Sequence, residues 1–555
     1  MKSWLHSNMP SPADSVTFLT QANTMTTTKT PGIDGGLTDY ARRKTLAAAA
    51  STALLSGAGL LASPATFAQS KRTSGRNAKS VTVGFRANPS SLDPHTGSGG
   101  SDHTILFTMF DTLIVADNEF RPQPGLAQSW EQRGDRELLL KIRRGVKFHD
   151  GTTLDAAAVK WNIDRIKDPK TRSTAAGSVS AIESVEVLDP YSVLIRTSAP
   201  SSPLLLNLAD RAGMMLSPAS VVKYGEDVRR NPVGSGPYRF DSWRQDSHVR
   251  VVAHEGYWDP KNMARTGTIN YRVFANEGPM IAALQTGEVD IGMLAETSVP
   301  ILRTSPNVSL IVRPGARVLG LRGNTSIGPL GDRNIRLAMA HTFDRDQIFN
   351  TLFKDGGTRG DGIISPAHAW AYDQKFKGPV RDLNKARALL KQSSMPDGFE
   401  LKIAAPTSVP EAVAVAQILQ AQLKEIGVTV SINNMELSRM VPAIKAGTMH
   451  AQSSFFSIRP DPDGYIFDQY HSTGGFYYGK DPQPLIDKLL TRARQSFDMA
   501  ERRNLYLQAQ EAVINLEATG FVWGCSSATW AVNKRIKGFS AGPEGKGRFH
   551  LIEVA

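Results

Sequence analysis

The sequence predicts a mixed α/β protein with more than one domain. Along residues 80–555, segments with alternating apolar residues are interleaved with segments whose apolar residues recur at helical spacing, and no repeat of roughly 20 to 50 residues is present. The hydrophobic fraction of 41% and the charged fraction of 21% are typical of a globular chain. The 555 residues correspond to three or four domains of about 150 residues each.

Cysteine content and charge exclude two classes of protein. Cys525 is the single cysteine, so no intramolecular disulfide can form and packing must supply the stability. The formal charge of +12 falls to +10 without residues 1–68, and outside residues 42–44 no basic run is longer than two. Scattered positive charge without interleaved aromatic residues predicts a diffusely basic protein with no nucleic-acid partner.

The N-terminal segment has the pattern of an export signal. Arg42 and Arg43 precede an apolar, alanine-rich run over residues 47–61, which is too short to span a bilayer, and small residues follow up to Ala68. We expect cleavage near Ala68, so that the mature chain begins near Gln69. The paired arginines resemble a twin-arginine signal, and a general secretory signal is the alternative. Residues 1–38 lack periodicity and are expected to be disordered, and translation from Met25 is the alternative start.

The first half of the mature chain contains mainly strand patterns. Val81, Val83 and Phe85 alternate as a first strand, and the Gly/Ser-rich loop after it is where ligands bind in many α/β domains. Two hairpins are expected: residues 185–187 with 193–195, and a strand entered through residues 231–240 with residues 248–253.

A strand and a helix are predicted between the first strand and these hairpins. Leu138, Leu140 and Ile142 form the strand pattern. Thr153 is the expected N-cap of a helix. Its buried face is expected to carry Ala156, Val159, Ile163 and Ile166.

The second half is more helical. Pro410 suits a first helical position, Gly427 suits the C′ position, and residues 428–432 alternate as a strand. The apolar stripe of that helix is Val415, Leu419, Leu423 and Ile426. A further helix over residues 500–516 would bury Leu505, Ala509, Ala512 and Leu516.

Several blocks, in this order, resemble one family, the extracellular solute-binding proteins of peptide/nickel-type ATP-binding-cassette (ABC) importers. The resemblance covers nearly all of residues 80–555. The blocks are LAQSWEQRGDRELLLKIRRGVKFHDG from Leu126, GSGPYRFDSWRQDSHVRVVAHEGYWD from Gly234, NIRLAMAHTFDRDQIF from Asn334, DLNKARALLKQSSMPDGFEL from Asp382, LQAQLKEIGVTVSI from Leu419, RPDPDGYIFDQYHSTGGFYYG from Arg459 and RRNLYLQAQEAVI from Arg502.

The resemblance implies a two-lobed periplasmic-binding-protein fold with hinged lobes that close over a small organic solute. It implies no catalytic step and no cofactor, and a membrane-embedded ABC permease as partner of a soluble, monomeric, periplasmic receptor. By analogy, residues 80–113, 233–300 and 517–555 form lobe I, residues 114–232 an inserted subdomain, and residues 301–516 lobe II.

The resemblance also identifies candidate ligand-binding residues and a departure from the peptide binders. Peptide-binding relatives place an aspartate where this chain has Ile458, and dipeptide binders use a basic residue where residues 404–409 have none. A free dipeptide is therefore an unexpected solute, because its charged ends would lack partners. Arg459 is the candidate for binding an anion, and the alternative is that it pairs with Asp461 or Asp463. The full candidate set is Arg459, Asp461, Asp463, Tyr470, Phe476, Tyr477, His95 and Asn324.

Two other classes of function have weaker support. Residues 538–542 match the G-x-S-x-G pattern of a secreted serine hydrolase, but Pro543 and Gly545 follow where a helix is required. His95, His103 and His149 are candidate ligands of a metal or metal complex, although loop histidines more often have ordinary hydrogen-bond roles. We expect no metal site.

Overall fold

The computed structural model describes residues 79–353, 356–407 and 409–555, and all structural statements concern these residues. The predicted export signal and the predicted disorder of residues 1–38 lie outside them.

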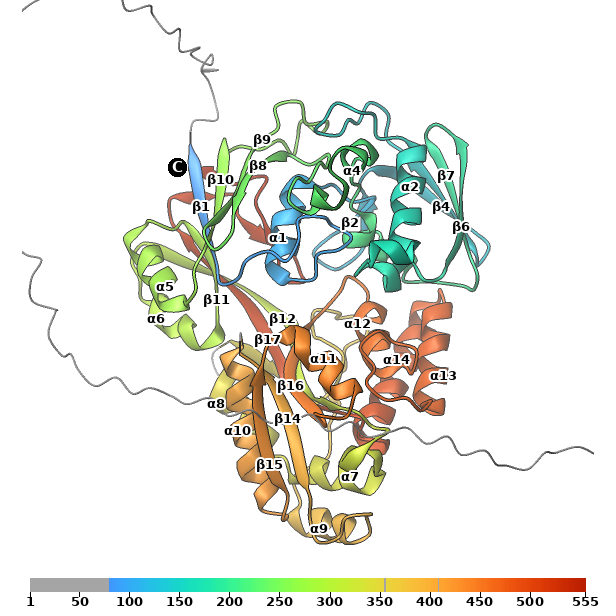
Figure 1. The fold of residues 1–555 in the computed structure, drawn as a ribbon, viewed down its shortest axis with the longest axis vertical. Helices are drawn as coiled ribbons and strands as arrows, with labels where there is room; N and C mark the ends of the chain where they lie inside the picture. The colour runs from blue at the N-terminus through green and yellow to red at the C-terminus, as the bar shows by residue number, and fades with distance from the viewer. Residues whose placement is uncertain (1–78, 354–355, 408) are drawn as a thin grey trace, which may run out of the picture. The chain divides into compact units, whose positions relative to one another are not determined.

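A central mixed sheet of eleven strands runs through the described residues (Figure 1). Ten strands follow the order β15-β14-β16-β12-β17-β11-β1-β10-β9-β8, and β13 pairs with β17. Their bounds are β1 Ser80–Phe85, β8 Tyr238–Arg244, β9 His248–Ala253, β10 Thr268–Val273, β11 Ile291–Leu294, β12 Val308–Gly323, β13 Gly357–Arg359, β14 Glu400–Pro406, β15 Thr429–Met435, β16 Ala451–Ser457 and β17 Gly520–Asn533.

Two long antiparallel strands, β12 and β17, connect the two ends of this sheet (Figure 1). Ala531, in the last part of β17, pairs with both Leu310 of β12 and Gly292 of β11, whereas the second half of β12 pairs with β16. We call the part built on β1 and β8–β11 lobe I and the part built on β14–β16 lobe II. The two-lobed α/β fold class is confirmed.

The register of β12 and β17 shifts between Arg313 and Arg317. Gly315 lies in this interval with a φ of +75°, and an added Cβ there would lie 2.6 Å from the Ser365 hydroxyl oxygen. A residue with a side chain would therefore be strained at the point where the strand passes between lobes.

A separate four-stranded sheet, β4-β5-β7-β6, adjoins lobe I. Its bounds are β4 Ala127–Arg133, β5 Glu137–Ile142, β6 Ile182–Asp189 and β7 Ser192–Thr197. It packs with helix α2 (Ala156–Lys167) around its own apolar core. The predicted strand at residues 138–142 and the predicted hairpin at 185–195 are confirmed as β5 and β6–β7.

The predicted helix face is confirmed but its predicted cap is wrong. Ala156, Val159, Ile163 and Ile166 of α2 are all buried. The N-cap is Asp155, whose side chain accepts a hydrogen bond from Ala158 N, whereas Thr153 pairs with Lys147 in a β-bridge. The bridge keeps Thr153 extended, so the helix begins two residues later than its sequence signal suggests.

The second half of the chain agrees with the predictions except at helix ends. Helix α10 (Pro410–Lys424) begins at Pro410, and Gly427 has a φ of +83° but lies beyond the C-cap Glu425 rather than directly next to it. Helix α14 (Met499–Glu511) continues into a π-turn, η7 (Ala512–Leu516). The wider turn rotates the apolar face, so Leu516 is 41% exposed and the prediction that it is buried is wrong.

The remaining elements complete the two lobes. In lobe I and its adjoining sheet they are α1 Gly100–Met109, β2 Ile114–Ala116, β3 Pro122–Pro124, η1 Pro169–Thr171, η2 Ala176–Val179, α3 Leu204–Asn207, η3 Arg211–Gly213, α4 Pro218–Tyr224, η4 Gly225–Arg229, α5 Glu277–Thr286, η5 Glu296–Ser298 and α6 Val299–Arg303. In lobe II they are η6 Gly328–Gly331, α7 Arg333–Thr342, α8 Arg345–Phe353, α9 Leu383–Lys391, α11 Leu437–Lys445, α12 Asp463–Tyr470 and α13 Pro484–Gln495. Four short strands near the C-terminus are β18 Ile536–Lys537, β19 Ser540–Ala541, β20 Gly547–Arg548 and β21 Glu553–Val554.

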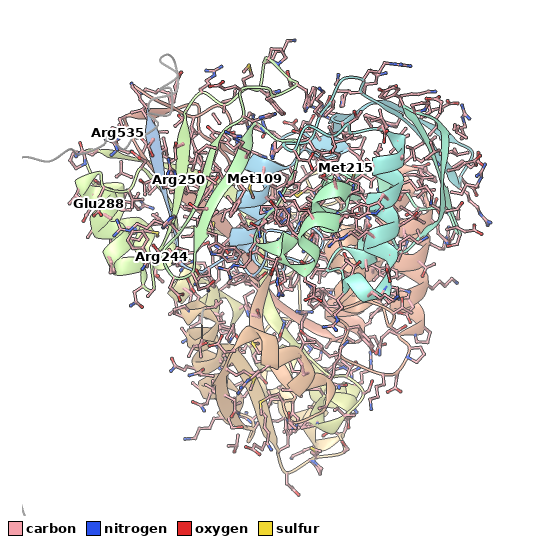
Figure 2. All side chains as sticks on the ribbon, turned by 45° about the horizontal axis from the view of Figure 1, so that its top comes forward. Met109, Met215, Arg244, Arg250, Glu288 and Arg535 are labelled. Atoms are coloured by element: carbon pink, nitrogen blue, oxygen red, sulfur yellow. The ribbon has the colours of Figure 1, made fainter. Side chains whose placement is uncertain are left out.

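Lobe I and its adjoining sheet contain separate apolar cores. Met109, at the end of α1, is buried in the core of the main sheet, and Met215 is buried in the core of the four-stranded sheet (Figure 2). Arg250 and Glu288 instead line a polar hollow on lobe I. In lobe II, Leu319 faces the core shared with α7, α8 and α10, whereas the adjacent Val318 faces the core shared with α12–α14.

Candidate functional site

The candidate site lies where lobe I and lobe II meet, around Arg459. This residue follows β16 directly after the buried Ile458, and its side chain is 41% exposed. The nearest carboxylate is Asp210 of lobe I, with 4.0 Å between Arg459 Nε and Asp210 Oδ2. The pair joins the two lobes at a distance longer than a hydrogen bond.

The two aspartates after Arg459 are bound by other arginines. Arg502 of α14 donates to both Asp461 oxygens at 2.8 and 3.0 Å, and Arg494 of α13 donates to Asp463 at 2.7 to 3.1 Å. Both carboxylates are buried. The alternative in which Arg459 pairs with Asp461 or Asp463 is therefore wrong, and the guanidinium of Arg459 stays partly exposed.

A histidine fixes the backbone of the Arg459 loop. His368 Nε2 lies 2.9 Å from the Arg459 carbonyl oxygen, and burial lowers the pKa of His368 to about 4. The neutral ring therefore donates through Nε2 at physiological pH. Its other nitrogen faces the Tyr465 hydroxyl at 3.5 Å.

A lobe I side chain packs on this histidine. Phe120, from the turn between β2 and β3, is 3% exposed and belongs to the lobe II core. Its ring is stacked on His368 with 4.7 Å between ring centroids and 14° between planes. Phe120 has a φ of +58°, which is unfavourable for a bulky residue. The Asp117 side chain stabilises the turn by accepting from Glu119 N at 2.9 Å and Arg121 N at 2.8 Å.

The other wall of the site contains buried charges of both signs. Burial alone would raise the pKa of Asp210, but the attraction of His103, Lys546 and Arg459 holds it well below its ordinary value. Burial lowers the pKa of Lys546 to about 8 against the attraction of Asp210 and Glu544. Burial lowers the pKa of His103 well below its ordinary value, so at neutral pH the positive charges of Lys546 and Arg459 face the carboxylates of Asp210 and Glu544.

A cavity of about 260 Å³ opens beside this cluster and is lined by residues of both lobes, including Asp210, Pro460 and Lys546. On its lobe I side, Asp111 accepts hydrogen bonds from Tyr257 Oη, Trp258 Nε1 and Ser235 Oγ. Burial raises the pKa of Asp111 to about 6, and these donors oppose the shift.

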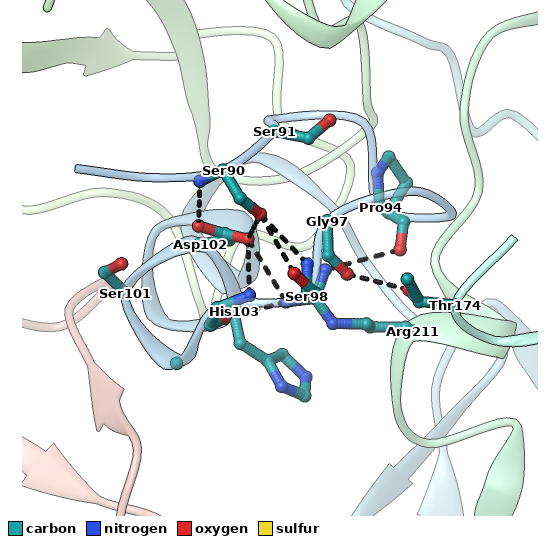
Figure 3. Close-up of polar contacts among 12 residues, drawn as sticks. Ser90, Ser91, Pro94, Gly97, Ser98, Ser101, Asp102, His103, Thr174 and Arg211 are labelled. Atoms are coloured by element: carbon teal, nitrogen blue, oxygen red, sulfur yellow. Dashed lines mark hydrogen bonds and ion pairs between the residues drawn. The ribbon is translucent and has the colours of Figure 1, made fainter. Parts of the chain in front are cut away.

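The loop after β1 is held in one conformation by a buried carboxylate (Figure 3). Asp102 of α1 accepts from Ser90 N at 2.6 Å, Ser90 Oγ at 2.5 Å and Gly99 N at 2.8 Å. Arg211 donates to the Gly99 carbonyl oxygen at 3.0 Å. Gly97 lies so close to Arg211 that an added Cβ would be 2.8 Å from its Nη1. These contacts hold the Gly/Ser-rich loop, where the sequence suggested a ligand position, against Asp102 and Arg211.

The structure does not bring the other candidate residues to Arg459. His95 is fully buried, with Nε2 3.2 Å from Met214 O and Nδ1 2.8 Å from Arg165 Nη1. Asn324, Tyr470 and Tyr477 are also buried. Tyr470 and Tyr477 lie beside Gly323 at the end of β12, and Asn324 follows Gly323 directly, whereas Arg317, six residues before Gly323, pairs with Ser457 just before Arg459. Phe476 is 47% exposed.

The structure does not bring together the residues that a serine hydrolase or a metal site would need. Ser540 is exposed on strand β19, with β20 rather than a helix following it. His103 faces Asp210, while His149 Nε2 lies 2.9 Å from Gly236 O and its ring packs against His254. Among the described residues no group of three or more His, Cys, Asp or Glu side chains is arranged to bind a metal ion.

Sequence reasoning missed Asp210, Lys546, His368 and Phe120. None of them belongs to a motif, and they are separated by long stretches of chain. The left-handed turn at Phe120 has one local signal, because Asp117 is the kind of residue that stabilises such turns.

A buried glutamate lies where β17 contacts η5. Glu296 is 6% exposed, neither carboxylate oxygen has a hydrogen-bond partner among the described residues, and Arg317 Nη2 lies 3.8 Å away. Burial raises the pKa of Glu296 to about 7 against the attraction of Arg317. Arg317 itself donates to Ser527 O at 3.2 Å and packs on Phe455.

Comparison with known proteins identifies the family. A protein-family model, described as bacterial extracellular solute-binding proteins, family 5 Middle, matches residues 121–477. The chain belongs to this family. It is a solute-binding protein of the kind that serves ABC importers.

Individual relatives agree with this assignment. The glutathione-binding protein GsiB of Shigella dysenteriae serotype 1 is 28% identical over 452 residues, covering 79% of this chain and 87% of GsiB. The fold is similar to the periplasmic binding protein DppA of Helicobacter pylori in complex with peptide STSA, with a TM-score of 0.76, 23% identity and coverage of 86% and 98%. It is also similar to the dipeptide-binding protein of Pseudoalteromonas sp. SM9913 in complex with Met-Leu, with a TM-score of 0.77, 23% identity and coverage of 86% and 100%.

No helix in the described part of the chain has both the length and the apolar character needed to cross a membrane.

Glu296 should make stability depend on pH. Its pKa rises from 4.5 to about 7 on folding, so its stabilising contribution is fully present below pH 4.5 and is lost as the pH rises through 7. Between these values the free energy of unfolding should fall by up to about 3 kcal/mol more in the wild type than in Glu296→Gln. Urea unfolding at a series of pH values measures this difference. Glu226→Gln, at an exposed position, is the control and should follow the wild type. Identical profiles for Glu296→Gln and the wild type would contradict the assignment.

Proposed function

We propose that the protein is an exported, monomeric receptor that captures an anionic, peptide-like organic solute between its lobes and delivers it to an ABC permease without catalysing a reaction. One observation carries the proposal. Arg459 keeps a half-exposed guanidinium 4.0 Å from Asp210 of lobe I, because Arg502 and Arg494 occupy the neighbouring carboxylates.

The charges around Arg459 support an anion. A guanidinium binds a carboxylate through two parallel hydrogen bonds, and its attraction is stronger in a site closed from water. Lys546 adds a buried positive charge on the lobe I side. Asp210 is the competing acceptor, and at 4.0 Å from Arg459 its contact is loose enough to be replaced by a ligand carboxylate.

The proposal disfavours free dipeptides as solutes. Ile458 is fully buried and offers no carboxylate to a ligand amino group, and residues 404–409 contain no basic side chain for a terminal carboxylate. An unpaired charge in the closed site costs several kcal/mol. Glutathione, which the relative GsiB is named for, is a suitable first probe because it carries two carboxylates.

We propose that the other candidate residues do not contact the solute. Several of them support the loops around the site. Asp461 and Asp463 support the Arg459 loop through Arg502 and Arg494, and His95 supports the loop after β1. Asn324, Tyr470 and Tyr477 are buried near the far end of β12, and exposed Phe476 lies in the same region. We assign the direct contact to Arg459.

The lobe boundaries follow the same proposal. Lobe I comprises residues 80–113, 233–300 and 517–555, residues 114–232 form an inserted subdomain, and lobe II comprises residues 301–516. The four-stranded sheet with its own core supports a subdomain within residues 114–232.

Export is expected to remove the first part of the chain. The arginine pair at residues 42 and 43 and the following apolar run support cleavage near Ala68 and a periplasmic location. N-terminal sequencing of the protein recovered from the periplasm should begin near Gln69. Recovery of the exported protein with residues 1–68 intact would contradict this expectation.

Arg459→Ala should weaken binding of the true solute by about tenfold to a hundredfold, since a charge-assisted bidentate contact is lost. Arg459→Lys should recover part of this loss, because an ammonium group cannot reproduce the paired geometry. Calorimetry with the solute released from denatured purified protein, with glutathione and with a panel of dipeptides measures these effects.

Arg492→Ala is the matched control for these variants, because Arg492 is an exposed arginine of α13 that binds Glu501. It should bind like the wild type. Unaltered binding by Arg459→Ala would refute the anion contact, and dipeptides that bind within a hundredfold of the true solute would refute the solute class.

Phe120→Ala should accelerate release of the solute by about tenfold. Phe120 joins lobe I to the His368 ring that fixes the Arg459 backbone. Its loss should therefore destabilise the closed complex and raise the dissociation rate, while the association rate changes less. Stopped-flow tryptophan fluorescence measures the rate. Val222→Ala, at an exposed position of α4 that lines no cavity near Arg459, should leave the rate unchanged. An unchanged rate in Phe120→Ala would show that this contact does not hold the lobes together.

A further inference from the structure

A buried arginine in lobe II lacks a counter-ion. Arg322 of β12 is 7% exposed, and its guanidinium lies 5.3 Å from the ring centroids of both Phe456 and Tyr478. Within residues 79–353, 356–407 and 409–555, no carboxylate pairs with Arg322 and no acceptor takes a hydrogen bond from its Nη1. A buried charge without a partner is costly, so an unbalanced Arg322 needs an explanation.

Four polar groups around the same small cavity also lack partners. The Tyr470 and Tyr478 hydroxyls, Thr519 Oγ1 and Gln469 Oε1 are each buried without a hydrogen bond among the described residues. They come from α12, the loop that follows it and the residue directly before β17, and together with Arg322 they line a small cavity of about 10 Å³. Unpaired buried polar atoms are rare in folded proteins, so five around one cavity indicate a missing occupant.

The chemistry of these groups favours a negative occupant. The guanidinium and the three hydroxyls can all donate hydrogen bonds, and the Gln469 amide can turn to present its N–H group. Burial raises the pKa of Tyr470 to about 12 against the attraction of Arg322, so this hydroxyl keeps its proton and cannot neutralise the arginine. The nearby Tyr477 hydroxyl is already bonded to Asp481 O at 2.8 Å.

We propose that this cavity binds one monatomic anion of the size of chloride, held by the Arg322 guanidinium and the hydroxyls of Tyr470, Tyr478 and Thr519. A cavity of about 10 Å³ has room for a single water-sized particle, which excludes phosphate, sulfate and carboxylates. A water molecule would satisfy the hydroxyls but would leave the guanidinium charge unbalanced.

The anion would connect segments that are far apart in the sequence. Arg322 lies near the end of β12, Tyr470 ends α12, and Thr519 directly precedes β17. One ion bonded to all three positions stabilises the far end of lobe II. This site is separate from the proposed solute site at Arg459, so either proposal can fail without the other.

Thermal unfolding at constant ionic strength tests the site. With sodium gluconate replaced stepwise by sodium chloride, the Tm of the full chain should rise and saturate, because an ion that binds only the folded state stabilises it in proportion to its occupancy. Bromide should act similarly, and sulfate, which does not fit, should not. A Tm that is the same in gluconate, chloride and bromide would overturn the proposal.

Substitutions locate the response. Arg322→Met should abolish the halide dependence, and Tyr478→Phe should raise the half-saturating halide concentration by about tenfold through the loss of one hydrogen bond to an ion. Arg333→Met, at an exposed position of α7, is the matched control and should respond like the wild type. An unaltered response in both Arg322→Met and Tyr478→Phe would place any halide effect elsewhere.

Crystals soaked in sodium bromide give a direct readout. An anomalous peak within hydrogen-bond distance of Arg322 is expected. Density without an anomalous peak at saturating bromide would identify the occupant as water and overturn the anion assignment.

Discussion

The pairing of β12 with β17 is the interaction on which the rest of the structure depends. Each strand belongs to both lobes: Ala531 of β17 pairs with β11 of lobe I, and the later half of β12 pairs with β16 of lobe II. The register shift near Gly315 allows the paired strands to change direction between the lobes. Glu296 and Arg317 lie beside this point, so the same pairing places a titrating buried acid between the lobes.

The location of the proposed solute site follows from that crossing. Because β16 pairs with the lobe II half of β12, its end delivers Arg459 to the boundary with lobe I. The guanidinium is available because arginines of α13 and α14 neutralise the two aspartates that follow it. Phe120 and His368 then tie the backbone of this loop to the opposite lobe, so that in the proposed function closure would be coupled to the orientation of Arg459.

The sequence predicted the regular elements well and their ends less well. Alternation at Val81 and Val83 and helical spacing at Val159 and Ile163 gave the correct strand and helix, because burial of one face imposes that period. Thr153 failed as a cap, since a bridge to Lys147 outweighs its local preference. Leu516 failed as a buried residue because a π-turn rotated the last part of the helix.

What the sequence alone determined is the family, the α/β elements and the candidate role of Arg459, because these depend on patterns close together in the chain. The tertiary structure decided which carboxylate faces Arg459: Asp210, more than two hundred residues away, rather than Asp461 or Asp463. It also placed Lys546 and Phe120 at the site and left Arg322 without a counter-ion. Such pairings are set by the packing of distant segments, and no local propensity or spacing encodes them.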